Sequence, residues 1–305
     1  MFPIDFFLSL GRLFGKVLLV PLLAHAQLRK LRPSEPRLLE SIGKALRVSR
    51  TQAFTIYRRS VASFIALSVE FFFISKHGQR ALQKKLDATK VIGAEQLAAV
   101  FASSRPVLVI TMYMGNFPLG FLKLMISVKS QRKLFVYKFN EKNANEDSLF
   151  ALFRRVSQNI EPLRAGEEGG KKAFLELRKG NVVAMLVDAE VHVTSREDVI
   201  FFNQRCPMQS GPATLAVLTK AVIVPIINYV DSSGRPVVRV ESPLYPDKKS
   251  LEVSNQQIIA RLTQDIARLM ESWIWIDPSQ VQRWSSIVQI INRSEPISQE
   301  DDHRL

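Results

Sequence analysis

Three segments of the sequence combine residue types that could take part in chemistry. The first is Thr111 to Pro118, which follows the apolar run VLVIT at 107–111 and contains Gly115 and Asn116. A glycine lets the backbone approach a ligand closely, and an asparagine amide can both donate and accept hydrogen bonds. A plain turn between a strand and a helix would explain the same Gly-Asn pair equally well.

The second segment runs from Asp188 to His192 and follows the apolar run VVAMLV at 182–187. Asp188, Glu190 and His192 place two carboxylates and an imidazole within five residues, a combination that could supply acid–base chemistry. The alternative is structural, because a helix cap and a solvated loop use the same residue types.

The third segment spans 201–216, where two phenylalanines precede Arg205. Ser210, Gly211 and Pro212 then begin a predicted helix. The free N–H groups of a helix N-terminus can bind an anion, and a nearby arginine would strengthen such a site.

The elements around these segments predict an α/β fold. Short apolar runs typical of buried strands occur at 107–111, 133–139, 182–187 and 221–227, and helical segments at 146–157, 170–179 and 210–219. Strands that alternate with helices indicate a mixed, largely parallel sheet flanked by helices. Ligands of such sheets meet the loops at the carboxyl ends of the strands, which is where the three segments lie.

Two further elements follow toward the C-terminus. The runs 221–230 and 236–242 are joined by Asp231-Ser-Ser-Gly234, which predicts a β-hairpin. Apolar residues at helical spacing predict a last helix over 252–275.

The N-terminal segment is apolar and basic. Its longest uncharged run, Val17 to Leu28, has 12 residues, fewer than the roughly 20 that a membrane-spanning helix needs. Arg12 and Lys16 lie four residues apart on one helical face, whereas Phe6 and Phe7 begin an apolar face. This pattern predicts an amphipathic helix in the membrane interface or a tilted anchor; a core helix of a soluble domain is the alternative.

The chain is accordingly divided into four parts: a membrane-docking helix and basic cluster at 1–35, a helical segment at 36–100, an α/β domain at 101–290 and a disordered polar tail at 291–305. A predicted helix over 51–75 carries Glu70 inside an otherwise uncharged run. A carboxylate at such a position favours packing against protein over membrane crossing.

Composition excludes several classes of protein. The 305 residues are 47% hydrophobic, which excludes a disordered chain. Cys206 is the single cysteine, so a disulfide-stapled secreted domain is excluded. Four histidines and one cysteine do not favour a structural zinc site, and no metal or cofactor is expected.

The charge of the chain indicates its partners. There are 42 Lys and Arg against 28 Asp and Glu, a net charge of +14; residues 1–60 hold eleven of the basic and three of the acidic residues, a net of +8. Basic and apolar residues in one segment favour an anionic membrane surface. No motif of Lys or Arg with interleaved aromatic residues is present, so nucleic acid is not an expected partner.

Taken together, these segments resemble the bacterial lipid A biosynthesis acyltransferases, the family of lauroyl and myristoyl transferases, over nearly the whole chain. The closest resemblance is FFNQRCPMQSGPATLA at 201–216, which is similar to the family's two phenylalanines, Gly-Arg-type turn and Gly-Pro-Ala before Leu-Ala. Further similar segments begin at Tyr137, Arg164, Leu177, Asp188 and Trp273. The Arg-Arg-Trp that usually follows the last of these is replaced by Asp277-Pro-Ser.

The departure from the family lies in its catalytic motif, a His separated by four residues from an Asp or Glu in a loop reading His-x-Gly-Asn-Trp-Glu. Here Tyr113 and Pro118 occupy the two catalytic positions, while Gly115 and Asn116 keep the register. A tyrosine has a reference pKa of about 10 and is protonated near neutral pH, so it is a poor base. Losing a general base typically costs a factor of about 10²–10⁴ in rate.

The resemblance implies acyl transfer from acyl carrier protein, or another acyl thioester donor, to a hydroxyl or amine of a lipid or other acceptor. It also implies membrane lipids as partners and the cytoplasmic face of a bacterial inner membrane as the location. Asp188, Glu190 or His192 would then supply a relocated base. The expected substrate-binding residues are Gly115, Asn116, Arg164, Arg205, Ser210 and Gly211, with either arginine as the anion-stabilising group.

The alternative is a catalytically inactive relative. Both members of the catalytic pair are replaced together, as loss of catalysis would produce. Such a protein would bind acyl chains, lipid or acyl carrier protein as a scaffold or regulator.

Overall fold

The computed structural model describes residues 35–128, 132–138, 150–151, 153–154, 159–164, 167–189, 195–247 and 253–293. The helices are α3 (Glu35–Leu46), α4 (Arg50–Ala88), α5 (Ala94–Ala102), α6 (Phe117–Val128), α8 (Glu167–Arg178), α9 (Gly211–Thr219), α10 (Asn255–Ile276), the 3₁₀ helix η2 (Pro278–Gln280) and α11 (Trp284–Asn292). The strands are β1 (Lys90–Ile92), β2 (Val107–Thr111), β3 (Leu134–Lys138), β4 (Ile160–Arg164), β5 (Val182–Leu186), β6 (Arg196–Phe201), β7 (Gln204–Gln209), β8 (Val222–Val230) and β9 (Pro236–Val240).

Seven strands form one sheet in the order β1-β9-β8-β2-β5-β3-β4. All neighbours pair in parallel except β8 and β9, which are antiparallel. The predicted mixed, largely parallel sheet is therefore confirmed, and so is the predicted β8–β9 hairpin. The hairpin turn is closed by a hydrogen bond of 2.9 Å from the Gly234 N–H to the Asp231 carbonyl.

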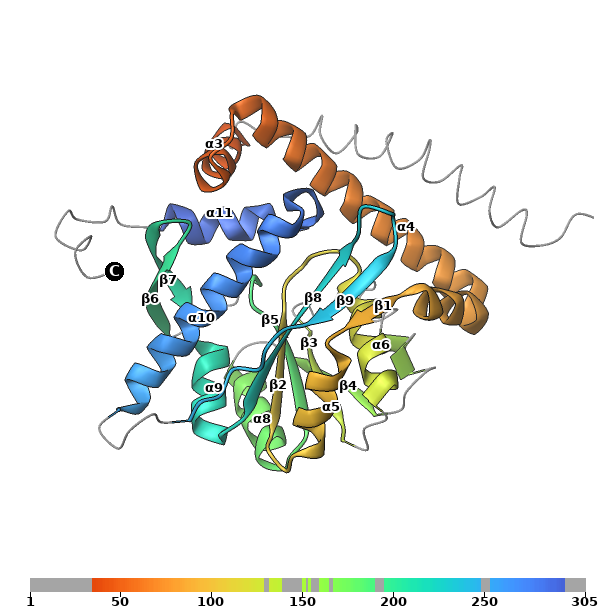
Figure 1. Ribbon diagram of the computed structural model, residues 1–305, viewed down its shortest axis with the longest axis vertical. Helices are drawn as coiled ribbons and strands as arrows, with labels where there is room; N and C mark the ends of the chain where they lie inside the picture. Colours follow the sequence, from red (N-terminus) through yellow and green to blue (C-terminus); the bar gives the residue numbers. More distant parts are fainter. Residues whose placement is uncertain are drawn as a thin grey trace, which may run out of the picture.

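Helices cover both faces of the sheet (Figure 1), with α5 and α6 on one face and α8, α9 and α10 on the other. All five residues of the central strand β2 are buried, as expected for a parallel strand covered on both sides. Leu108 and Ile110 belong to one core cluster and Val107 and Val109 to the other, because successive side chains of a strand point to opposite faces.

The predicted helix over 51–75 is part of α4, a longer helix that bends at Gly78, where φ is 73°. Glu70 pairs with Lys85 and accepts a hydrogen bond from Asn116, so its predicted packing against protein is confirmed. Within the described ranges, no helix combines the length and the apolar character that crossing a membrane would require.

The segment 201–216, treated above as a strand-end loop, is different in the structure. Its first half belongs to a separate two-stranded hairpin of β6 and β7. Phe202 and Asn203 form the tight turn with positive φ angles of 50° and 57°. The reason is that exposed or intermediate residues alternate with buried ones from Arg205 to Gln209, a period-2 pattern that is typical of a strand. The predicted helix start is confirmed, since α9 begins at Gly211 directly after Ser210.

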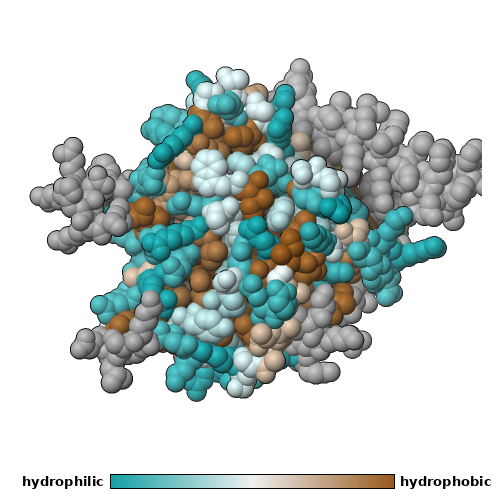
Figure 2. All heavy atoms as spheres, in the orientation of Figure 1, coloured by the Kyte–Doolittle hydropathy of each residue, from teal (hydrophilic) through white to brown (hydrophobic). Residues whose placement is uncertain are grey.

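On the face seen in Figure 2, hydrophobic side chains form several separate patches among polar ones. Phe54 and Phe64 of α4 are 40% and 50% exposed. The predicted membrane-docking residues Phe6, Phe7, Arg12 and Lys16 lie outside the described residues, as do positions 294–305 of the predicted tail.

Candidate functional site

The loop after β2, which contains Gly115 and Asn116, is held by main-chain hydrogen bonds to Gln280 and Gln282, at the end of η2 and directly after it. Met114 forms an antiparallel bridge with Val281. The Tyr113 carbonyl accepts the Gln282 N–H at 2.8 Å, and the Gly115 N–H donates to the Gln280 carbonyl at 3.4 Å. This segment therefore behaves as a short extra strand that fixes the path of the loop.

Tyr113 is buried, with 8% of its surface exposed. Its ring contacts Phe117 edge to face, with 5.1 Å between ring centroids, and the Arg283 guanidinium lies over it, 3.9 Å from the centroid. Leu186 and Ala189 complete the same apolar cluster. The ring at this position is thus packed as a core residue beneath an arginine.

Asp188 lies directly behind Tyr113. Both carboxylate oxygens accept the Tyr113 backbone N–H at 3.0 Å, and the residue is 1% exposed. Burial raises the pKa of Asp188 to about 7, although the Tyr113 N–H and the charge of Arg283 act in the opposite direction. At its present position this carboxyl group supports the loop backbone.

Gly115 and Asn116 make the turn into α6. Gly115 has a φ of +52°, and a Cβ atom there would lie 2.5 Å from the Asn228 carbonyl oxygen, so this position requires glycine. The Asn116 Oδ1 accepts the Leu119 N–H at 3.3 Å, while its Nδ2 donates to Glu70 Oε2 at 3.3 Å. Pro118 is buried in the first turn of α6.

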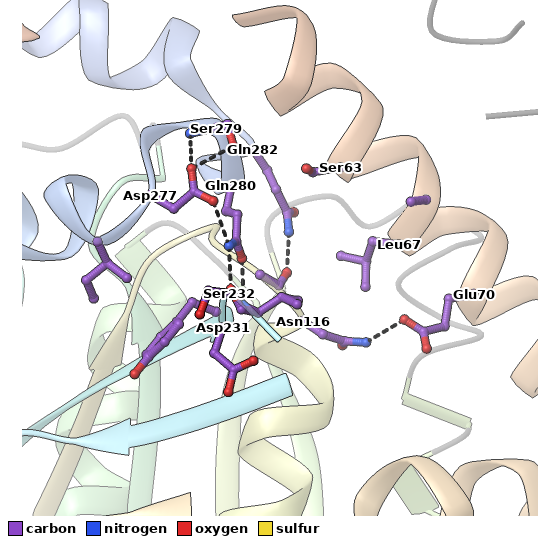
Figure 3. Close-up of a pocket in the computed structure, with 15 residues that line it drawn as sticks. Ser63, Leu67, Glu70, Asn116, Asp231, Ser232, Asp277, Ser279, Gln280 and Gln282 are labelled. Atoms are coloured by element: carbon purple, nitrogen blue, oxygen red, sulfur yellow. Dashed lines mark hydrogen bonds between the residues drawn. The ribbon is translucent and has the colours of Figure 1, made fainter. Parts of the chain in front are cut away.

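A cleft of about 630 Å³ opens beside this turn. It lies between one face of α4, the Gly115-Asn116 turn, the β8–β9 hairpin and residues 277–282, which contain η2 and are called the η2 segment below. Figure 3 shows Leu67 and Glu70 reaching from α4 toward the opposite wall, with Glu70 directed at Asn116. The lining residues are Ser63, Ala66, Leu67, Glu70, Gly115, Asn116, Tyr229, Val230, Asp231, Ser232, Ile276, Asp277, Ser279, Gln280 and Gln282.

The structure brings only some of the predicted site residues together. Gly115 and Asn116 line the cleft, and Tyr113, Pro118 and Asp188 pack behind the same loop. Glu190 and His192 lie outside the described residues.

The other predicted substrate-binding residues lie elsewhere. Arg164 is in the edge strand β4, three strands from β2. Arg205 lies exposed on the β6–β7 hairpin. Ser210 is fully buried, and its hydroxyl shares a hydrogen bond of 2.7 Å with the hydroxyl of Ser195, so this side chain is engaged within the protein.

The sequence patterns did not predict two residues of the site, Glu70 and Arg283. Glu70 was interpreted as a packing residue, and no local pattern placed it beside Asn116. Arg283 and Trp284 form an Arg-Trp pair, but five residues beyond the position where the family's Arg-Arg-Trp was sought. Among the described residues, no group of three His, Cys, Asp or Glu side chains could hold a metal ion.

Comparison with known proteins agrees with this architecture. No curated protein among those compared matches the chain. Residues 47–284, more than three quarters of the sequence, match the family described as bacterial lipid A biosynthesis acyltransferase. The match includes the loop after β2, α4 and the η2 segment that frame the cleft. The resemblance found in the sequence is therefore confirmed, and the chain belongs to the bacterial lipid A biosynthesis acyltransferase family.

Proposed function

We propose that this protein transfers an acyl group from a thioester donor to a hydroxyl or amine of a lipid acceptor, using a base outside the family's two catalytic positions. The observation that carries the proposal is the cleft of about 630 Å³ beside Gly115 and Asn116. Gly115 and Asn116 keep the register of the family's catalytic motif in the sequence, and a cleft beside them supports acyl transfer at this loop.

The chemistry requires a base that takes a proton from the acceptor as its oxygen or nitrogen attacks the thioester carbonyl. The carbon–sulfur bond then breaks and the thiolate of the donor leaves. Tyr113 is buried beneath Arg283, and Asp188 faces the backbone of the loop. Glu70 lines the cleft and contacts Asn116, which makes it a candidate base; His192 remains the candidate predicted from the sequence.

The second candidate function is a non-catalytic relative that binds acyl chains, lipid or acyl carrier protein. The observation that favours it is the packing of Tyr113, whose ring is held among Phe117, Leu186 and Ala189. Pro118 offers no polar side chain at the second catalytic position.

We place the protein on the cytoplasmic face of a bacterial inner membrane. The support is the apolar and basic sequence of residues 1–35, which suits an interfacial helix on anionic lipid. The net charge of +14 also suits an acidic carrier protein as donor.

The test is a transfer assay with the purified full chain, labelled acyl carrier protein thioester and a bacterial lipid extract. Label appearing in a lipid would support the enzyme, and its loss by at least about 10²-fold in Glu70→Gln or His192→Ala would identify the base. A matched control is Glu95→Gln, a carboxylate in the first turn of α5. Saturable donor or lipid binding without any transfer would support the non-catalytic alternative instead.

A further inference from the structure

The cleft is lined by both apolar and polar side chains. One face of α4 supplies Ser63, Ala66, Leu67 and Glu70, at the spacing of residues that share a helical face. Ser63, Ala66 and Leu67 form a mostly apolar surface on this wall of the cleft. Glu70 lies at the end of that surface, next to Asn116. Such a surface suits a molecule with an apolar part and a polar end.

The opposite wall also combines apolar and polar side chains. Val230 and Ile276 are apolar, whereas the neighbouring η2 segment contributes polar side chains. A volume of about 630 Å³ lies inside the range of roughly 300–1,000 Å³ that is typical of small-ligand pockets. The cleft can therefore enclose part of a lipid-sized molecule.

The charges of the cleft are unusual for this protein. The chain as a whole carries +14, yet the described lining contains three carboxylates, Glu70, Asp231 and Asp277, and no Lys, Arg or His. Proteins usually bind phosphate with arginine or lysine side chains or at a helix N-terminus. The described lining borders the N-terminus of α6, but the Leu119 N–H there already donates to Asn116. The composition of this lining disfavours a phosphorylated head group.

Two of these carboxylates are engaged in local turns. The Asp231 Oδ1 accepts the backbone N–H groups of Ser233 and Arg235, and the Asp277 Oδ1 accepts that of Ser279. Both therefore shape the walls of the cleft.

Glu70 differs, because its contacts join separate elements. It pairs with Lys85 across the bend of α4 and accepts from Asn116 at 3.3 Å, longer than the roughly 2.7–2.9 Å of a strong charge-assisted hydrogen bond. A ligand group that donates a shorter hydrogen bond to Glu70 could replace the Asn116 amide as its donor.

From this arrangement we infer that the cleft takes a single-chain amphiphile whose head group carries a hydroxyl or amine and no phosphate. The chain lies along Leu67, Val230 and Ile276, and the head group donates to Glu70. This rests on the proposed function, because it names the chemical class of the acceptor.

The experiment measures binding to the full chain stabilised in amphipol. Three probes share one alkyl chain and differ in the head group: decylamine, decyl glucoside and decyl phosphate, each below its critical micelle concentration. We expect decylamine or decyl glucoside to bind at least about tenfold more tightly than decyl phosphate, and their order tells whether the amine or the hydroxyl is preferred. Equal or tighter binding of decyl phosphate would overturn the inference.

A matched pair of variants tests the role of Glu70. Glu70→Gln and Lys85→Met both remove the ion pair, so a merely structural role predicts the same change in both. We expect Glu70→Gln to weaken binding of the preferred probe about tenfold or more, because a hydrogen bond to a charged group is lost. Lys85→Met should bind the probe at least as tightly as the wild type, because the carboxylate loses a competing cation. Equal weakening in both variants would refute the assignment.

The binding experiment and the transfer assay can contradict the inferred ligand class and the proposed enzyme independently. Selective binding of the non-phosphorylated probes without acyl transfer would support the inferred ligand class and reject the enzyme. Acyl transfer that is confined to phosphorylated lipids would support the enzyme and reject the inferred class.

Discussion

At the scale of single residues, buried side chains hold the loop after β2 in place. Tyr113 has become a buried ring that stacks under Arg283, and Asp188 fixes the backbone of the same residue. The edge-to-face contact of Tyr113 with Phe117 contributes about 0.5–1.5 kcal/mol beyond simple burial. Tyr113 therefore contributes to the stability of this chain, at a position where the resemblance predicts a catalytic histidine.

Asp188 makes stability depend on pH. Its pKa is raised from 3.8 to about 7 in the folded state, so the folded protein keeps a proton that the unfolded chain releases. The free energy of unfolding should therefore fall as pH rises from about 4 to 7, by at most about 1.4 kcal/mol per pH unit. Denaturant unfolding at several pH values should show a flatter profile for Asp188→Asn.

The control for this measurement is Asp247→Asn. Asp247 pairs with Arg105, which holds its pKa below the usual range, so its removal should leave the decline between pH 4 and 7 in place. A profile of Asp188→Asn as steep as that of the wild type would contradict the assignment.

Gly115 should be the least replaceable glycine of the site. In Gly115→Ala, the alanine has to adopt a left-handed backbone conformation, which costs about 1–2 kcal/mol of stability. Its Cβ atom would also lie 2.5 Å from the Asn228 carbonyl oxygen. Gly234 has a similar φ of +80° but open space around it. Gly234→Ala should therefore cost only the backbone term, and Gly115→Ala about 1–3 kcal/mol more in denaturant unfolding. An equal loss of stability in the two variants would show that a small shift of the backbone relieves the close contact between the Cβ atom and the Asn228 carbonyl.

At the scale of elements, the η2 segment joins parts of the chain that are far apart in sequence. Val281 bridges Met114 and accepts the Ser60 hydroxyl of α4. The Gln280 side chain accepts the Val230 N–H at 2.7 Å and donates to the Val230 carbonyl at 2.8 Å. One short segment thus sets the spacing between α4, the motif loop and the hairpin, and with it the shape of the cleft.

Gln280→Ala should loosen this junction. The variant loses both side-chain hydrogen bonds to Val230 and one to Asp277, which should lower the free energy of unfolding by about 1–3 kcal/mol and weaken amphiphile binding. Gln83→Ala removes an exposed glutamine of α4 that bonds Asp87, and should change stability by less than about 0.5 kcal/mol. Unaltered probe binding by Gln280→Ala would mean that η2 does not shape the cleft.

At the scale of the whole molecule, charge and apolar character are unevenly distributed. More than half of the net charge of +14 lies in residues 1–60, whereas the charged side chains in the described lining of the cleft are carboxylates. This separation suits a protein that meets an anionic surface through one end and holds a non-anionic group in another place.

Removal of residues 1–30 should shift the protein from the membrane fraction to the soluble or aggregated fraction. The reason is loss of the predicted apolar face of Phe6 and Phe7 together with the charges of Arg12 and Lys16. The measurement is fractionation or vesicle flotation, with Arg12→Glu/Lys16→Glu as a variant that removes only the electrostatic part. Unchanged membrane partition after the removal would refute the docking assignment.

The sequence by itself determined the α/β class, the strands β2, β3, β5 and β8, the β8–β9 hairpin and family membership. The strands and the hairpin follow from local signals, because a buried strand appears as a short apolar run and a tight turn requires particular residues. Family membership rested on the resemblance of several segments taken together. The β6–β7 hairpin was missed although its alternation was present, because the aromatic and glycine-proline signals around it suggested a loop.

Only the tertiary structure decided which side chains meet at the cleft. Glu70 and Asn116 are separated by 46 residues, and Tyr113 and Asp188 by 75, yet both pairs are within hydrogen-bonding distance. Arg283 reaches the ring of Tyr113 because the segment after η2 pairs with the motif loop. Such contacts depend on how helices and strands pack, and that packing cannot be deduced from the spacing of residues along the chain.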